Sequence, residues 1–215
     1  VNQLFRFAGL NQNSTLKEIG VIKFIGQIDG SVLTPNIKID LDTSSTLLAA
    51  SGQLDVLSIV PAVKGLKFQI KAKSTSKFLK LAGIKAITAK QLGAVDVDGE
   101  INGNLISPSL AFNVKAVGGI AAVSGKINTL PIGETFDLSL RVSHPEMSHL
   151  IRSIGGYKPV AKVGPIDIQG QLIGSAKNMA LKGITAKAGN IDLRGNILIG
   201  LEGQRPQIKA DLTSG

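Results

Sequence analysis

The sequence predicts a mostly β protein: an elongated, curved antiparallel sheet built from three repeats of roughly 72 residues. Apolar and polar residues alternate along many short runs, as they do in strands with one apolar and one polar face. The 25 glycines are spread along the 215 residues, which suits many strands separated by tight turns. Similar segments also recur three times in the same order.

The internal repeat is the most informative of these observations. Three kinds of glycine-containing segment recur, and successive copies are separated by 70 (195 − 125) to 74 (83 − 9) residues. Constant order and spacing indicate duplicated units. We therefore expect repeats at 1–75, 76–147 and 148–215, forming one continuous elongated domain. The recurring glycines are Gly9, Gly83 and Gly155 in the first segment, Gly30, Gly103 and Gly174 in the second, and Gly52, Gly125 and Gly195 in the third.

Each repeat is expected to contain about four strands. In one clear run, Phe136, Leu138, Leu140 and Val142 alternate with Asp137, Ser139 and Arg141. Periodicity leaves open whether residues 84–90 supply a fifth strand. Three glycines recur within predicted strands, where they predict kinks or bulges that curve the sheet; they are Gly26, Gly99 and Gly170.

A short amphipathic helix is predicted at the head of each repeat. In the third copy, Pro145 suits the first helical position because its missing N–H has no partner there anyway. The apolar residues that follow at i, i+3, i+4 and i+7 would share one helical face; they are Met147, Leu150, Ile151 and Ile154.

Helices this short cannot cover the predicted sheet. A helix of about 8 residues is about 12 Å long, whereas four strands span about 19 Å. We therefore expect the sheet to curl and leave an apolar groove, open to a long apolar molecule such as an acyl chain. The expected lining residues are Leu66, Phe68, Ile70, Val95, Val97, Ile101, Leu110, Phe112, Val114, Phe136, Leu138, Leu140, Ile166, Ile168, Leu172, Ile208 and Leu212.

Several of these segments resemble the AsmA family of proteobacterial envelope proteins. The similarity is best over 136–215 and weaker over the earlier copies. The segments are 136–145, Leu150-Ile-Arg-Ser-Ile-Gly155, Gly164-Pro-Ile-Asp-Ile168, Arg205-Pro206 and Ala210-Asp-Leu212.

The resemblance implies a periplasmic protein of a Gram-negative bacterium, anchored to the inner membrane by a helix outside this segment. Its curved sheet would be similar to the hydrophobic grooves of bridge-like lipid transfer proteins. The implied partner is a phospholipid or another acyl lipid, and the implied role is lipid transport to the outer membrane or its maintenance. The family offers no catalytic motif and no cofactor to carry over. A structural β-repeat that acts as an envelope scaffold or spacer without ligand is the alternative.

The sequence contains few residues that could form the active site of an enzyme or bind a metal ion. The chain has no cysteine and two histidines, His144 and His149, and nothing marks a nucleophile elbow or a third metal ligand. Helix capping and surface exposure are the favoured interpretations of both histidines. We expect no catalytic residue, no cofactor and no metal. Asp96, Asp98 and Glu100 are expected on the solvated side of a strand, because an EF-hand loop would need a glycine turn.

The net charge of +9 raises the question of nucleic acid. However, Lys67, Lys71 and Lys73 alternate with apolar residues, which is typical of the solvated face of a sheet. Seven Phe, one Tyr and no Trp provide few stacking residues. We expect no nucleic-acid partner. Val1 leads us to expect a segment of a longer protein, and no apolar run reaches the ~20 residues that a transmembrane helix needs.

Overall fold

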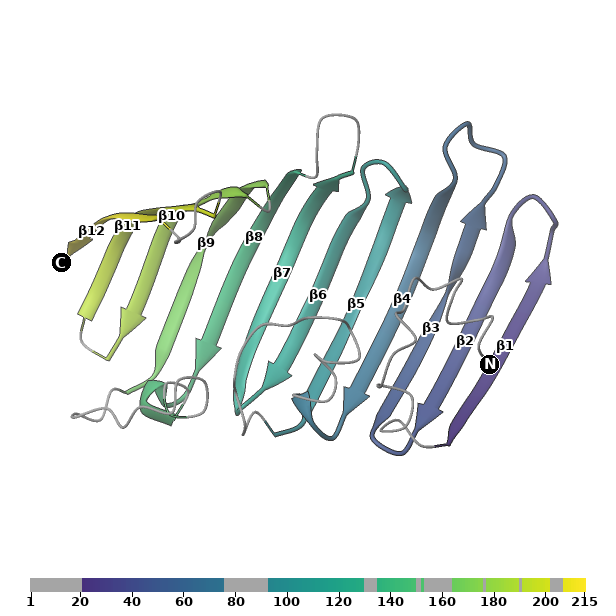
Figure 1. The fold of residues 1–215 in the computed structure, drawn as a ribbon, viewed down its shortest axis with the longest axis horizontal. Coiled ribbons are helices and arrows are strands. Elements are labelled where there is room, and N and C mark those ends of the chain that lie inside the picture. The colour runs from purple at the N-terminus through teal and green to yellow at the C-terminus, as the bar shows by residue number, and fades with distance from the viewer. Residues whose placement is uncertain are drawn as a thin grey trace.

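A single antiparallel sheet dominates the computed structural model of this protein (Figure 1). The structure describes residues 21–75, 93–129, 135–149, 152, 164–175, 177–189, 191–201 and 207–215. The prediction of a mostly β, antiparallel protein is confirmed, with twelve strands in one open sheet. The strands are β1 (Ile22–Gly30), β2 (Pro35–Thr43), β3 (Thr46–Asp55), β4 (Ala62–Ala72), β5 (Val95–Asn104), β6 (Ser109–Ala116), β7 (Gly119–Asn128), β8 (Thr135–His144), β9 (Ile166–Ser175), β10 (Asn178–Ala188), β11 (Ile191–Gly200) and β12 (Gln207–Ser214).

The topology is the simplest that twelve strands can have. Every strand pairs with the one before it and the one after it, so spatial order equals sequence order from β1 to β12. Most of the connections are short, since antiparallel neighbours need only a tight turn. The connections from β4 to β5 and from β8 to β9, at 73–94 and 145–165, are longer. One of the two-residue turns consists of Val117 and Gly118, between the paired Ala116 and Gly119. Both have positive φ, 55° and 84°, as a type I′ hairpin turn requires.

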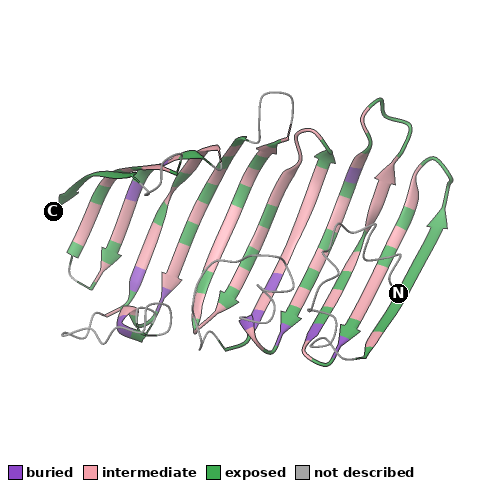
Figure 2. Ribbon diagram, in the orientation of Figure 1, coloured by how far each residue is buried: buried purple, intermediate pink, exposed green. Residues whose placement is uncertain are grey.

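The sheet forms one layer in the described part of the chain. Contacts between strands are concentrated between sheet neighbours, and no large described side chain is fully buried. The main cluster of buried residues comprises Ala72, Val95 and Val97, on the paired strands β4 and β5. Most other strand residues are only partly buried (Figure 2). In Figure 1 the strands at the C-terminal end are seen nearly edge-on, so the sheet curves there.

The predicted helices fall mostly outside the described residues. The head of the third repeat is partly described, and its described residues 147–149 and 152 are helical. Pro145 precedes these helical residues rather than occupying the first helical position. The side chain of His144 accepts the Glu146 N–H beside it. The candidate fifth strand at 84–90 also lies outside the described residues.

Two bulges shape the described sheet. Neither has its extra residue at Gly26, Gly99 or Gly170, although the bulge of β10 lies opposite Gly170. The pairing register shifts around Gly65 in β4 and Gly183 in β10, where φ is 56° and 57°. A β-bulge with a glycine in the left-handed region explains both positions. An asparagine on a neighbouring strand accepts each bulge N–H: Asn102 Oδ1 that of Gly65 at 2.6 Å, and Asn196 Oδ1 that of Gly183 at 3.0 Å.

Gly99 has a different role: it makes room for two aromatic rings. It lies directly opposite Phe68 on β4 and Phe112 on β6. A Cβ at this position would lie 2.5 Å from Phe112 Cβ, 2.6 Å from Ala111 O and 2.8 Å from Phe68 Cζ. The glycine thus lets two phenylalanines pack over the middle of the sheet.

We expect Gly99→Ala to lower the free energy of unfolding by about 1–3 kcal/mol, the usual cost of overpacking. Gly170→Ala is the matched control, because its Cβ would meet nothing closer than Lys182 O at 3.2 Å and should cost less. Urea denaturation followed by circular dichroism measures both. Equal losses in the two variants would contradict this explanation of Gly99.

Candidate functional site: the apolar face

The pairing register places every predicted groove residue on one face of the sheet. Directly opposite residues in adjacent strands point to the same side, and the pairs connect Phe68 through Gly99 and Phe112 to Val123 and Leu140. Following the other cross-strand pairs in the same way places the rest of the predicted lining residues, from Leu66 in β4 to Leu212 in β12, on this side of the sheet as well. We call this side the apolar face and the other side the polar face.

The apolar face carries no Asp, Glu, Lys or Arg along the twelve described strands. Its few polar residues, Thr43, Thr46, His144 and Ser214, lie at strand ends. It also has members that the prediction did not name. They include Ile22, Phe24, Ile28, Ile37, Ile39, Leu41, Leu48, Val123, Ile127, Val142, Met179, Leu181, Ile184, Leu193, Ile197 and Ile199.

The polar face is rich in opposite charges on neighbouring strands. Lys71 lies opposite Asp96, and Lys67 opposite Glu100. Arg141 Nη2 donates to Asp167 Oδ2 at 2.9 Å, and this carboxylate raises the pKa of Arg141. Such cross-strand pairs favour the observed register. The interpretation of Lys67, Lys71 and Lys73 as solvated residues is confirmed, since all three are exposed.

An ion pair beside the bulge of β4 also joins opposite charges on adjacent strands. Lys64 Nζ lies 3.2 Å from Asp55 Oδ2. The hydrogen bond from Lys64 and its charge hold the pKa of the Asp55 carboxyl below its ordinary value. Both side chains remain in contact with solvent, so the pair helps to specify the pairing of β3 with β4 more than it stabilises the fold.

Nothing among the described residues forms a second layer over the apolar face. Near the sheet edges its side chains are strongly exposed: Phe24 by 48%, Ile28 by 76% and Ile208 by 69%. In the interior, Phe112, Leu138 and Ile168 are partly buried by their neighbours within the sheet. Val97 is more enclosed than these three residues, at 8% exposure. The described face is therefore an open apolar surface.

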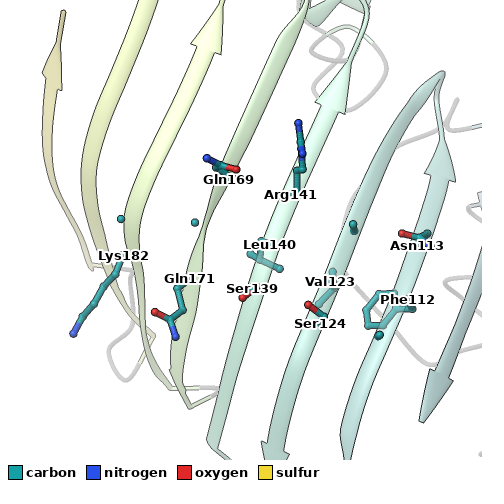
Figure 3. Close-up of a pocket in the computed structure, with 14 residues that line it drawn as sticks. Phe112, Asn113, Val123, Ser124, Ser139, Leu140, Arg141, Gln169, Gln171 and Lys182 are labelled. Carbon is teal, nitrogen blue, oxygen red and sulfur yellow. The ribbon is translucent and has the colours of Figure 1, made fainter. Parts of the chain in front are cut away.

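The predicted groove on this face is not confirmed. Hollows of about 730, 420 and 410 Å³ lie instead along the polar face. The largest extends from β6 to β10 (Figure 3). Small side chains, such as Ala122 and Ser139, lie in its lining together with longer ones, such as Arg141 and Lys182. Its lining residues are Ala111, Phe112, Asn113, Ala122, Val123, Ser124, Ser139, Leu140, Arg141, Gln169, Gly170, Gln171, Lys182 and Gly183.

Sequence reasoning missed this polar hollow because its residues come from five strands and share no motif. In Figure 3, Arg141 and Lys182 extend from different strands and point in different directions. Asn113 donates to Asp98 and Gln171 to Asp137, at 3.2 and 2.7 Å. These bonds belong to the cross-strand network of the polar face, and the hollow has no arrangement of nucleophile and base.

The two histidines have a structural arrangement. His144 is only 3% exposed, so the expectation of surface exposure is wrong for this residue, while His149 is exposed as expected. His144 Nε2 donates to Val117 O at 2.9 Å and its Nδ1 accepts the Glu146 N–H at 2.9 Å. Both ring nitrogens are therefore engaged by backbone groups. Among the described residues, no three potential ligands cluster in a way that would hold a metal ion.

We expect His144→Ala to lower the free energy of unfolding by about 1–3 kcal/mol, because the Val117 carbonyl and the Glu146 N–H lose their partner. His149→Ala serves as the control. Its ring only stacks on His144, with centroids 6.0 Å apart, and an exposed substitution of this kind costs within about 0.5 kcal/mol. Thermal denaturation compares the two variants. A His144→Ala protein as stable as His149→Ala would contradict the bridging role.

Comparisons with known proteins add no functional assignment: no family model, curated protein or solved structure matches this chain. Within the described residues, no helix is both long enough and apolar enough to cross a membrane.

Proposed function

We propose that this chain is a lipid-binding module of an AsmA-like protein, anchored in the inner membrane and working in the periplasm. Its apolar face would shield the acyl chains of phospholipid during transport to the outer membrane or its maintenance. The proposal includes three repeats, each with a short helix and four strands, corresponding to β1–β4, β5–β8 and β9–β12. The protein acts by binding, and the proposal involves no catalytic residue and no cofactor.

The observation that supports this proposal is the unbroken apolar face. Twelve strands at about 4.8 Å spacing extend about 53 Å, and strands of ten residues are about 33 Å long. Soluble monomers rarely expose a contiguous apolar patch of more than a few hundred Å². An apolar face without a charge over this area is costly in water unless something apolar covers it.

The chemistry of the face fits a mobile acyl chain. Burial of a methylene contributes about 0.8 kcal/mol whatever its position along the chain. An open face covers only one side of each methylene, so lipid contacts here are individually weaker than in an enclosed pocket. Weak, uniform contacts hold a lipid without fixing it at one place, as transport along a sheet requires.

A structural scaffold without ligand is the second candidate. It is favoured by the position of the hollows, which lie on the polar face. An open sheet without an apolar cleft can also serve as a spacer in the cell envelope, with its apolar face covered by another protein layer. The two candidates differ in whether lipid contacts the apolar face.

Site-specific photocrosslinking tests this difference. A benzophenone amino acid is placed at Leu138 or Ile168 on the apolar face, and at Ser139 or Gln169, the adjacent residues on the polar face. The protein is purified gently from membranes, irradiated, and analysed by mass spectrometry for phospholipid adducts. Adducts at Leu138 and Ile168 but not at Ser139 and Gln169 are expected. Equal labelling on both faces, or none on either, would overturn the proposal.

A pair of double variants tests the same face without a probe. Phe112→Asp with Leu138→Asp should reduce co-purified phospholipid in native mass spectrometry at least tenfold, because each new carboxylate must lose water to contact an acyl chain. Asn113→Asp with Ser139→Asp adds the same charge to the polar face and should leave the lipid content unchanged. Circular dichroism establishes that both proteins fold. A folded apolar-face variant that retains its lipid would count against lipid binding.

A further inference from the structure

Loops alternate between the two ends of the strands, because each strand runs antiparallel to its neighbours. Loops that follow odd-numbered strands lie at one end, the upper end of β1–β8 in Figure 1, which we call the upper rim. The opposite end is the lower rim, with the two-residue turns 44–45 and 117–118. The described residues of the upper-rim loops are 31–34, 56–61, 105–108, 129, 177 and 201.

Exposed apolar side chains are concentrated at the upper rim. Outside the strands, eight large apolar residues of the described chain are exposed, and seven of them belong to these loops. The eighth, Val21, precedes β1 at the lower rim. Turns are ordinarily rich in Gly, Pro, Asn, Asp and Ser, so a row of apolar loop tips indicates a partner. The seven residues are Val32, Leu33, Val56, Leu57, Ile59, Leu105 and Leu201.

The three fully described loops of the upper rim also carry no charge. Asp55, which directly precedes the second loop, is paired with Lys64 in β4. A charged side chain would oppose the transfer of a loop out of water, and these loops contain none. Their sequences are Ser31-Val-Leu-Thr34, Val56-Leu-Ser-Ile-Val-Pro61 and Leu105-Ile-Ser-Pro108.

Side chains at the start of these loops accept hydrogen bonds from the loop backbone. Ser31 Oγ accepts the Leu33 N–H at 3.2 Å. Asn104 Oδ1 accepts the N–H groups of Ile106 and Ser107, at 3.1 and 2.8 Å. A polar group that already has a partner costs less to remove from water than a free one.

Backbone hydrogen bonds join each of these loops to the next. The Val56 N–H donates to Leu33 O at 3.2 Å, and the Leu105 N–H donates to Pro61 O at 3.0 Å. The three loops therefore form one ordered row. From β1 to β6 the row extends about 24 Å, at about 4.8 Å per strand. Loops that are already ordered lose little conformational freedom on binding.

We infer that the upper rim inserts its apolar loops into the interfacial layer of a lipid bilayer, with the loop 56–61 foremost. Within that loop, Leu57 and Ile59 have exposed fractions of 65% and 104%. Insertion would place the long axis of the sheet along the membrane surface, since the upper rim follows this axis (Figure 1). The inference concerns the loops rather than the apolar face, and it does not rest on the proposed function.

A bilayer fits these loops better than a folded protein does. A protein interface has a tightly packed core surrounded by polar groups. Here the apolar side chains belong to separate loops, and none of the three hollows described above includes a residue of 31–34, 56–61 or 105–108. A bilayer needs no complementary shape, because the burial of apolar groups is non-directional.

Fluorescent labels measure insertion directly, and the chain is suited to them because it has no cysteine. Ile59→Cys and Ser45→Cys are labelled with an environment-sensitive nitrobenzoxadiazole dye and mixed with phosphatidylcholine vesicles. The emission at position 59 should shift to the blue and be quenched by nitroxide lipids, because this loop enters the bilayer. The label at position 45, on the lower rim, should show neither change.

A pair of double variants tests which apolar residues are responsible. Leu57→Asp with Ile59→Asp should reduce partitioning into phosphatidylcholine vesicles about tenfold in flotation assays, because carboxylates resist transfer out of water. Leu47→Asp with Ile120→Asp is the matched control and should bind as the unaltered protein does. These two residues are also exposed, but they lie on the polar face. Binding should persist in about 0.5 M NaCl, where surface charges are screened.

Equal loss of binding in the two double variants, like responses of the two labels, or release of the protein by salt would overturn the inference. So would a Leu57→Asp, Ile59→Asp protein whose oligomeric state changes in sedimentation velocity while its vesicle binding does not, because the rim would then serve a protein contact. Phe112→Asp with Leu138→Asp should still bind vesicles through its intact loops. That variant tests the proposed function, so failure of the one is distinguishable from failure of the other.

Discussion

The fold depends on one constraint: side chains alternate between the two sides of a strand, and this alternation stays in phase across twelve strands. Cross-strand pairing carries the phase from Phe24 in β1 to Leu212 in β12. Two bulges, at Gly65 and Gly183, add residues without reversing it. Every strand can therefore contribute its apolar residues to the same face. A shift of a single residue in any strand would bring charges onto that face.

The charges on the polar face reinforce this arrangement. Lysines and carboxylates oppose each other across adjacent strands, as Lys187 does with Asp167 on one side and Asp192 on the other. Exposed pairs of this kind contribute little to stability, but they disfavour wrong registers because a slip brings like charges together. The apolar residues make the sheet stable, and the charges make its register unique.

The sequence was sufficient to predict the strands and the composition of the apolar face. Period-two alternation identifies residues such as Leu138 and Leu140 directly, and every predicted groove residue lies on this face. The polar hollow was harder to predict, because its lining residues come from five strands. Ala122, Ser139 and Lys182 come together at the polar hollow only through pairing. The two bulges do share a sequence pattern. In each, a Lys-Gly pair precedes a residue of the apolar face, Leu66 in one and Ile184 in the other.

The bridging role of His144 could not be predicted from its sequence neighbours. Its partner, Val117 O, lies 27 positions away in the turn between β6 and β7. The turn and the end of β8 meet because Ile120 pairs with Ser143. Gly119 is also required there, since a Cβ at that position would lie 2.7 Å from His144 Cδ2. Contacts of this kind follow from the pairing register and become visible only once it is known.

The central claim is that the apolar face is open to water in the free protein and covered when lipid is bound. Spin labels on single cysteines at Leu138 and Ser139 test it directly, through their collision rates with oxygen and with a polar relaxation agent. The account predicts that phospholipid shields the label at Leu138 from the polar agent and leaves the label at Ser139 unchanged. A Leu138 label that is already shielded without lipid, or that responds as Ser139 does, would contradict it.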